Sequence, residues 1–433
     1  MRVSTALISK YSVDALNEQQ AKLTRLQSQV STGQRMLAPA DDPYGSARAL
    51  NLNETIMVTD QLQVNGAYAD DRLATADGVL ENLTGSMQRV RELAIGIKND
   101  TNNAQARSFV AAEVRQLYDQ IAQLANTTDA NNEFLFSGFQ GNTKPFTPNA
   151  ITGAMDYNGD SGQRFAKIGP STQVPISDSG DDLLIRVRNG NGTFVTQQGA
   201  ANTGAGIIDM GSVTGTYVPD DYTVKFIGPT VPPNAATDPV EYYIVDRNSN
   251  IVEPAGYAGQ AEAVFQADVA ANITGGTQYQ ESAALQGLGA LGVTTSISGA
   301  PAAGDTFQIR RSDNQDVFTT LNNMITALGT SVVTDSDRAR MHNDLNRVIT
   351  DLDQSMSKVL DVQAKVGARL NTVARQKDIN DSYGLQLKQT ISLVQDLDYA
   401  EAVTQLNVQI AGLEAAQKTY QKIQGLSLFN FIN

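Results

Sequence analysis

The chain of 433 residues contains no cysteine, no tryptophan and a single histidine, His342. Without cysteine it has no disulfide framework, no thiolate zinc site and no thiol nucleophile. Aromatic residues make up only 6% of the chain, a composition that suits long thin helices better than large aromatic-centred cores. No stretch approaches the roughly 18 apolar residues of a membrane span, and the first residues lack the apolar run and cleavage site of a signal peptide.

Positive charge is also scarce. Lysine and arginine total 32 against 46 acidic residues, which gives a formal net charge of -14. Such a balance repels nucleic acid and anionic membrane surfaces, so neither is expected as a partner. The length exceeds the size at which one hydrophobic core stops growing and predicts two or three domains.

No group of residues with the pattern of a catalytic or metal site can be assembled. His342 lies on the flank of an apolar helical stripe, which indicates a surface or boundary position. The paired carboxylates, such as Asp41 with Asp42, are adjacent and do not converge on one point of a helix. Asp42 before Pro43 instead has the pattern of a helix N-cap followed by proline at the first helical position. We therefore expect no enzyme activity, no cofactor and no metal.

Proline and glycine divide the chain into helical ends and a different middle. Eleven of the 13 prolines lie from Pro145 to Pro301, and 23 of the 35 glycines lie between residues 140 and 310. The middle also contains β-prone runs: YTVKFIGP, EYYIVDRNSNIVEP with a turn around Asn248 and Ser249, and DLLIRVRNGNGTFVT, in which residues 189–192 would close a hairpin. The predicted fold class is mainly α with an inserted, mostly β domain at residues 141–311.

The helical parts carry apolar residues at alternating steps of three and four, as in coiled coils. The last of these stripes predicts one helix of about 60 residues, about 90 Å long, from about Asp335 to Asp396. We interpret the three inner stripes as core packing between neighbouring helices. Their members are Leu73, Ala76, Leu80, Leu83, Met87, Val90, Ala94 and Ile97; Val110, Val114, Leu117, Ile121 and Leu124; and Leu345, Val348, Leu352, Val359, Val362, Val366, Leu370 and Val373.

The first and last segments each predict a lone helix with a narrow apolar stripe, which the helix cannot bury against itself. A helix gains most of its stability by packing such a stripe against a partner. We expect the two termini to pair with each other, and the apolar C-terminal tail to need further surface from other copies of the chain. The predicted assembly interface comprises Leu16, Leu23, Leu26, Val30, Val403, Leu406, Ile410, Leu413, Tyr420, Ile423, Leu426, Leu428, Phe429 and Phe431.

Several motifs resemble the bacterial flagellin superfamily. The stretch QVSTGQRMLAPADDPYGSARAL, residues 29–50, is similar to the helix-break-helix motif near the start of flagellins, and MQRVRELAIGIKNDTNN, residues 87–103, to their central N-terminal helix. The short MRVST start, EFLFSGFQGNTKPF, GDTFQI and the ending SLFNFIN match the type that joins hook to filament. The resemblance covers residues 1–146 and 304–433.

The resemblance implies a helical-bundle or coiled-coil stem formed by both termini. Residues 1–42 and 400–433 would form a terminal coiled coil, 43–140 and 312–399 a helical rod domain, and 141–311 an outer domain. The function implied is a structural ring that connects the hook, through the adjacent hook-associated junction protein, to the flagellin filament. Export through the flagellar type III system without signal cleavage, an extracellular place on the flagellum and a chaperone for the C-terminal segment follow from the same resemblance.

Three alternatives remain open on the sequence. The nearest is filament flagellin of the same superfamily. A hydrolytic activity in the insert would need a converging acid, base or metal cluster, and the insert has no histidine. An adhesin would bind a host surface through the acidic insert, and no motif there indicates a particular ligand.

Overall fold

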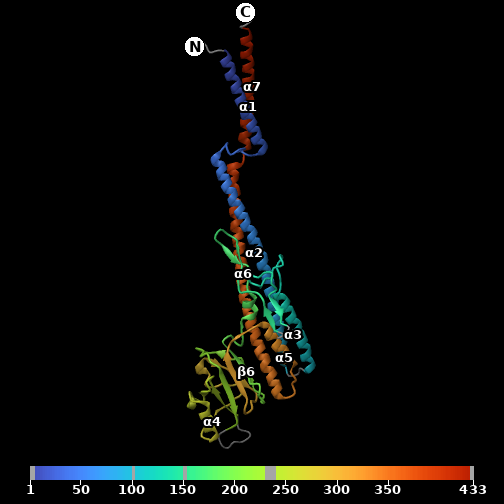
Figure 1. Ribbon diagram of the computed structural model, residues 1–433, viewed down its shortest axis with the longest axis vertical. Coiled ribbons are helices and arrows are strands. Elements are labelled where there is room, and N and C mark those ends of the chain that lie inside the picture. Colours follow the sequence, from blue (N-terminus) through green and yellow to red (C-terminus); the bar gives the residue numbers. More distant parts are fainter. Residues whose placement is uncertain (1–4, 100–102, 150–153, 230–239, 430–433) are drawn as a thin grey trace. The chain divides into compact units, whose positions relative to one another are not determined.

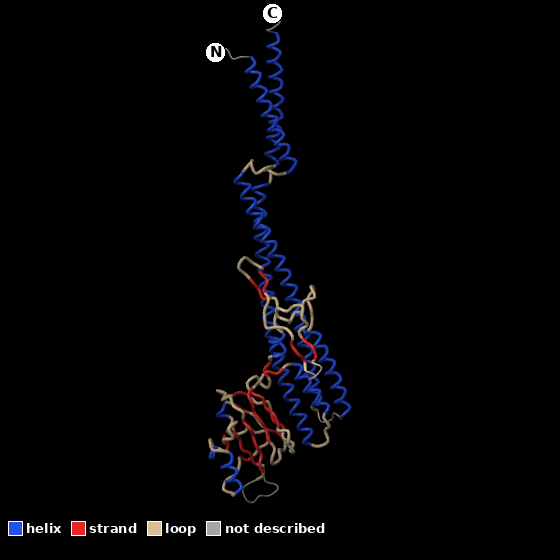
Figure 2. The backbone as a smooth tube through the Cα atoms, in the orientation of Figure 1, coloured by secondary structure: helices blue, strands red, loops and turns tan. Residues whose placement is uncertain are grey.

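The computed structural model describes residues 5–99, 103–149, 154–229 and 240–429. Long helices dominate both ends of the chain, and strands are concentrated in the middle (Figures 1 and 2). The mainly α fold with an inserted β region, predicted from the sequence, is confirmed. The helices are α1 Thr5–Thr32, α2 Pro43–Ile97, α3 Ala104–Ala125, α4 Glu262–Ala270, α5 Val317–Gly329, α6 Asp335–Gln395 and α7 Tyr399–Phe429.

The chain folds as two compact units. The first consists of residues 1–67, 167–172 and 374–433, and the second of residues 68–166 and 173–373. Each unit thus combines segments that are distant in sequence. Helices α2 and α6 each contribute one portion to the first unit and another to the second.

In the second unit, the inner apolar stripes form a helical core. Leu80, Leu83, Met87 and Val90 of α2 are fully buried, and so are Leu345 and Leu352 of α6. Helix α6 runs for 61 residues, as its stripe predicts. His342 is half-buried on this helix, at the boundary position expected. The interpretation of these stripes as core packing is therefore confirmed.

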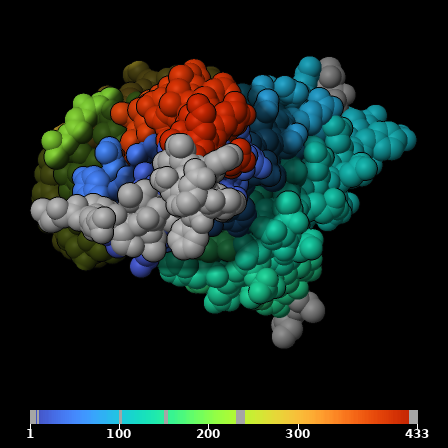
Figure 3. All heavy atoms as spheres, turned by 90° about the horizontal axis from the view of Figure 1, so that it is seen from above, coloured from blue at the N-terminus to red at the C-terminus, as the bar shows by residue number. Residues whose placement is uncertain are grey.

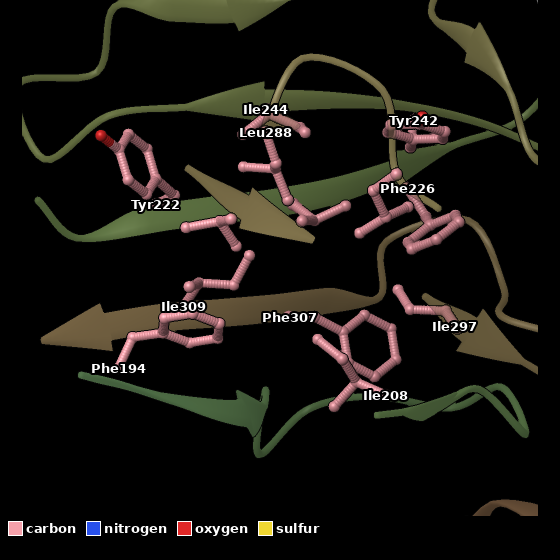
Figure 4. Packing of buried hydrophobic residues seen from close by; sticks show 13 residues of the cluster. Phe194, Ile208, Tyr222, Phe226, Tyr242, Ile244, Leu288, Ile297, Phe307 and Ile309 are labelled. Atoms are coloured by element: carbon pink, nitrogen blue, oxygen red, sulfur yellow. The ribbon is translucent and has the colours of Figure 1, made fainter. Parts of the chain in front are cut away.

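The β region of the second unit is built around one antiparallel sheet with strand order β11-β10-β9-β15-β6, and β12 pairs with β10. Phe194, Phe226, Phe307, Ile244 and Ile309 fill the core on one face of this sheet (Figure 4). In a second apolar cluster, Phe265 of α4 packs with residues of β10 and β11. These two apolar clusters give the insert a core of its own.

Outside β6, β9, β10 and β15, the strands have only two or three residues. Their bounds are β1 Phe146–Pro148, β2 Met155–Tyr157, β3 Phe165–Lys167, β4 Gln173–Pro175, β5 Val187–Arg188, β6 Phe194–Gln198, β7 Ile207–Ile208, β8 Ser212–Val213, β9 Tyr222–Ile227, β10 Glu241–Val245, β11 Ile251–Glu253, β12 Thr277–Gln278, β13 Val293–Thr294, β14 Ile297–Ser298, β15 Thr306–Arg311 and β16 Asn314–Gln315. A short π-helix spans Asp181–Ile185.

Two of the three expected β segments form as predicted. YTVKFI is β9, and EYYIV with IVE forms the β10–β11 hairpin, whose turn is held by the Asp246 carboxylate accepting from the backbone amides of Asn248 and Asn250. The hairpin expected at residues 182–196 is wrong. Its turn exists, but the two arms pair with strands far along the chain instead of with each other: β5 with β16 over two residue pairs, and β6 with β15 over five.

A buried carboxylate on α6 holds the base of the insert. Asp351 accepts hydrogen bonds from the backbone amide of Gly190 at 2.7 Å and from the Gln315 side chain at 2.9 Å. Burial raises the pKa of Asp351 from 3.8 to about 6, although these two donors and the nearby Arg347 favour the ionised form. Burial likewise raises the pKa of Asp344, about two turns earlier on α6.

This raised pKa predicts a stability that falls with rising pH. A carboxyl group whose pKa is higher in the folded than in the unfolded state contributes its full stability below pH 3.8 and loses it as the pH rises through about 6. The loss is expected to reach about 2–3 kcal/mol by pH 7.5. Asp351→Asn keeps an acceptor for Gly190 and removes the charge, so its advantage over the wild type in urea unfolding should grow from pH 4.5 to pH 7.5. A constant difference across that range would contradict the prediction.

Candidate assembly surface

The break between α1 and α2 is a fixed elbow rather than a loose connection. The Asp41 carboxylate accepts from the backbone amides of Leu37 and Ala38 and pairs with Arg25 at 3.0 Å. The amides of Ala38 and Leu37, with a smaller contribution from Arg25, lower the pKa of Asp41 below its ordinary value. The amides of Leu37 and Ala38 thus have a partner within the chain.

Asp42 is the N-cap predicted from the sequence. Its Oδ1 atom accepts from the backbone amide of Gly45 at 2.8 Å, and α2 begins at Pro43. Arg35 joins the elbow to the other end of the chain, because its guanidinium donates to the Val394 carbonyl at 2.9 Å and its backbone amide to the Gln395 carbonyl. The elbow residues 33–42 therefore tie α1, α2 and the end of α6 together.

The terminal helices α1 and α7 pack side by side, so the predicted pairing of the two ends is found in the structure (Figures 1 and 3). Ala402 is 3% exposed and marks the face of α7 that meets α1. The predicted interface residues on these facing sides are half-buried within the single chain. They are Leu16, Leu23, Leu26 and Val30 of α1, and Leu406, Leu413 and Tyr420 of α7.

Other predicted interface residues are uncovered. Val403 is 43% exposed and Ile410 is 38% exposed, and they lie seven residues apart, about two turns, on α7. The structure describes the course of α7 to Phe429 but not the side chains of Ile423, Leu426, Leu428 and Phe429, and Phe431 lies outside the described residues. The assignment of these fourteen residues to an assembly interface therefore stays a prediction.

The first unit leaves an unusual amount of apolar surface open. It contains less than a third of the residues but more than half of the exposed large hydrophobic side chains in the described part of the chain. Exposed apolar side chains that are concentrated in one region favour contact with a partner there. They include Leu50, Met57, Val58 and Val64 of α2, Ile379, Tyr383, Leu385 and Leu393 of α6, and Tyr399, Val403, Val408 and Ile410 of α7.

A hollow of about 610 Å³ beside α3 is walled mainly by apolar and aromatic side chains such as Tyr118, Phe146 and Met155, with Asp119 and Lys144 as its charged groups. Among the described residues, no three histidine, aspartate or glutamate side chains gather so as to hold a metal ion. Within the same residues, no helix has the length and apolarity needed to cross a membrane.

The structure also shows a buried charge network that the sequence analysis missed. Arg72 of α2 is 1% exposed and pairs with Asp129, which is 5% exposed. Its guanidinium also donates to the carbonyls of Ile176 at 2.9 Å and Phe134 at 3.1 Å. Arg72 therefore joins α2 to the FLFSG segment and to the end of the β4 loop. The available signal was a lone arginine beside Leu73, within an otherwise apolar stripe.

Comparison with known proteins shows which proteins this chain resembles. The profile of the bacterial flagellin N-terminal helical region matches residues 3–141. The flagellar hook-associated protein 3 of Salmonella typhimurium is 22% identical over 431 residues, 99% of both chains. That of Escherichia coli is 27% identical over 184 residues, which are 42% of this chain and 57% of the E. coli protein.

A solved structure agrees with both sequence comparisons. The crystal structure of flagellar hook-associated protein 3 from Legionella pneumophila superposes with a TM-score of 0.70 at 29% identity, and covers 79% of this chain and 98% of the other. Residues 3–141 therefore resemble the N-terminal helical region of bacterial flagellins. In sequence over nearly its full length, and in structure over 79% of it, the chain is similar to flagellar hook-associated protein 3.

Proposed function

We propose that the protein forms a ring that connects the hook of the bacterial flagellum to the flagellin filament. The observation that carries this proposal is the apolar surface that α7 and the adjoining parts of the first unit leave open in a single chain. Repeated contacts between identical copies cover such a surface, and a contact between two different faces of one chain gives a ring when the rotation between copies closes. The role is structural rather than enzymatic.

The three sequence-based segments have separate tasks in this proposal. Residues 1–42 and 400–433 form the inner coiled coil, 43–140 and 312–399 the surrounding helical rod, and 141–311 the outward domain. The described helices and the separate apolar core of the insert support this division. Only the first two segments need to contact other subunits for the ring to form.

The partners follow from this placement. The ring contacts the adjacent hook-associated junction protein on one side and flagellin on the other. The chain reaches the extracellular flagellum through the flagellar type III system, without signal cleavage, and an export chaperone binds its apolar C-terminal segment before assembly.

The alternative is filament flagellin of the same superfamily, and it differs in the number of copies per flagellum. A junction ring needs a few copies, whereas a filament needs one for every subunit along its length. Quantitative immunoblotting of purified flagella, combined with gold labelling, should find few copies, located at the hook–filament boundary. Labelling along the whole filament would support flagellin and overturn the proposal.

A further prediction concerns the insert. Where the chain enters and leaves the main sheet, the Asn189 amide donates to the Asp313 carbonyl at 3.0 Å, and the Asp313 amide donates to the Asn189 side chain at 2.9 Å. These residues extend the β5–β16 ladder and are placed to flank a two-residue hairpin turn. Replacing residues 190–312 with Asn-Gly should therefore keep the helical circular dichroism and the entry into flagella.

The control for this excision breaks the same junction without removing the insert, by changing Asn189 and Asp313 to Pro in the full chain. This variant should lose stability, because proline removes both ladder donors. A shortened chain that is exported and stable yet absent from flagella would show that the insert takes part in assembly.

A further inference from the structure

One row of exposed apolar residues lies on the part of α2 that belongs to the first unit. Leu50, Met57 and Val64 are 70%, 66% and 62% exposed and follow one another at intervals of seven residues. The buried side of the same helix carries Thr59 and Leu62. At 100° per residue Thr59 is turned by about 200° from Met57, so the row points away from the side of α2 that is packed within the chain.

A second row lies on the part of α6 in the same unit. Ile379 and Leu393 are 59% and 85% exposed, and Gln386 is exposed midway between them, again at intervals of seven residues. Each of the three stands one residue before a buried position, namely Asn380, Leu387 and Val394. The α6 row is therefore turned by about 100° from the buried face of its helix.

Contacts inside the unit show which residues of the two rows lie at the same level along the helix axes. Near Val64 and Ile379, the side chains of Gln63 and Asp381 are hydrogen-bonded. At the other end, Leu50 and Gln395 line the same hollow beside the elbow. The helices run antiparallel, so Leu50 lies level with Leu393, Met57 with Gln386 and Val64 with Ile379.

We infer that the α2 row of one copy packs antiparallel against the α6 row of the next copy, with Leu50 beside Leu393 and Val64 beside Ile379. This inference rests on the proposed ring. Copies related by rotation about a ring axis keep the same height, and the equal seven-residue steps then bring all three pairs into register, as in a coiled coil. Because the two rows belong to different helices, the contact is heterologous and suits a closed ring.

The net charges of the two helix segments and the area that the two rows can bury agree with a second copy of the chain as the partner. Residues 43–67 of α2 carry two acidic residues and one basic residue, and residues 374–395 of α6 carry three basic and two acidic ones. The two faces therefore have net charges of opposite sign. Three side chains a row bury less than the roughly 1,200 Å² of a stable pairwise interface, so the contact holds only when it recurs around a closed assembly.

The absence of cysteine allows a direct test by crosslinking. Cells that lack the native copy would produce two differently tagged chains, one with Val64→Cys and the other with Ile379→Cys. Oxidation of intact flagella is expected to give a dimer that carries both tags, and Leu50→Cys with Leu393→Cys should give one as well. In the control, Val64→Cys with Leu393→Cys, the thiols lie about 21 Å apart along the helices, beyond disulfide reach.

The tags report separately whether each chain has entered the flagella. Tagged chains that are present in flagella but give no mixed dimer would overturn the contact and leave the ring proposal standing. Dimers of Val64→Cys with itself, or equal crosslinking in the control pair, would also overturn it, because they indicate a symmetric or shifted contact. If even the unsubstituted chain is absent from flagella, the ring proposal fails and the contact with it.

Discussion

Ile410→Asp is expected to release filaments from the hook while leaving the isolated chain folded. Ile410 is 38% exposed and lies about 40° around α7 from Leu406, at the edge of the contact with α1, so a carboxylate at this position can stay hydrated in the monomer. In the proposed ring the same position is closed by a neighbouring copy. A penalty of about 3 kcal/mol at each contact would weaken association by roughly a hundredfold, and the penalty recurs in every copy.

Two measurements check this prediction, thermal unfolding of the purified variant and flagellin in the culture supernatant. Gln405→Asp adds the same charge at an exposed polar position of α7 and should retain filaments. Leu406→Asp, at a half-buried position facing α1, should instead lower the thermal stability of the isolated chain. Full-length filaments on cells that carry Ile410→Asp would contradict an interface on this face.

Arg72→Met is expected to give the largest loss of folding stability of any variant considered. The substitution keeps much of the side-chain volume but leaves Asp129 without its cation and the Ile176 carbonyl without its donor. The Phe134 carbonyl loses the guanidinium and keeps the Ser137 hydroxyl as donor. Breaking a buried ion pair by removing one partner costs about 3–5 kcal/mol, because the remaining charge stays buried. Urea unfolding followed by circular dichroism measures this change.

The matched control is Arg89→Met, on the same helix. Arg89 pairs with Glu92 and Glu113, but its side chain is 50% exposed, so water solvates the partners once the arginine is gone. No measurable change in stability is expected for this variant. An unfolding midpoint of Arg72→Met equal to that of Arg89→Met would show that the buried network contributes nothing to stability.

Local pattern in the sequence determined the helical framework. The stripe from Leu345 to Val373 predicts a single long helix, and α6 spans 61 residues. Asp42 followed by Pro43 predicts the start of α2, and the Asp42 carboxylate caps that helix. These features depend on residues within a few turns of one another, where periodicity and capping chemistry act directly.

Pairing between distant segments was decided only by the tertiary structure. The turn at residues 189–192 could be found in the sequence, but not that β5 pairs with β16 and β6 with β15, more than a hundred residues further on. The same holds for Arg72, whose partners Asp129 and Ile176 come from other parts of the chain.

The terminal helices show most clearly what the sequence determined and what the tertiary structure decided. The sequence determined that α1 and α7 each carry an apolar face. Only the packed structure decided that Leu406 and Leu413 lie half-buried on the side toward α1, whereas Val403 and Ile410 remain open. The physical reason is that periodicity within a helix gives the direction of a side chain about its own axis, whereas burial depends on which other helix lies there.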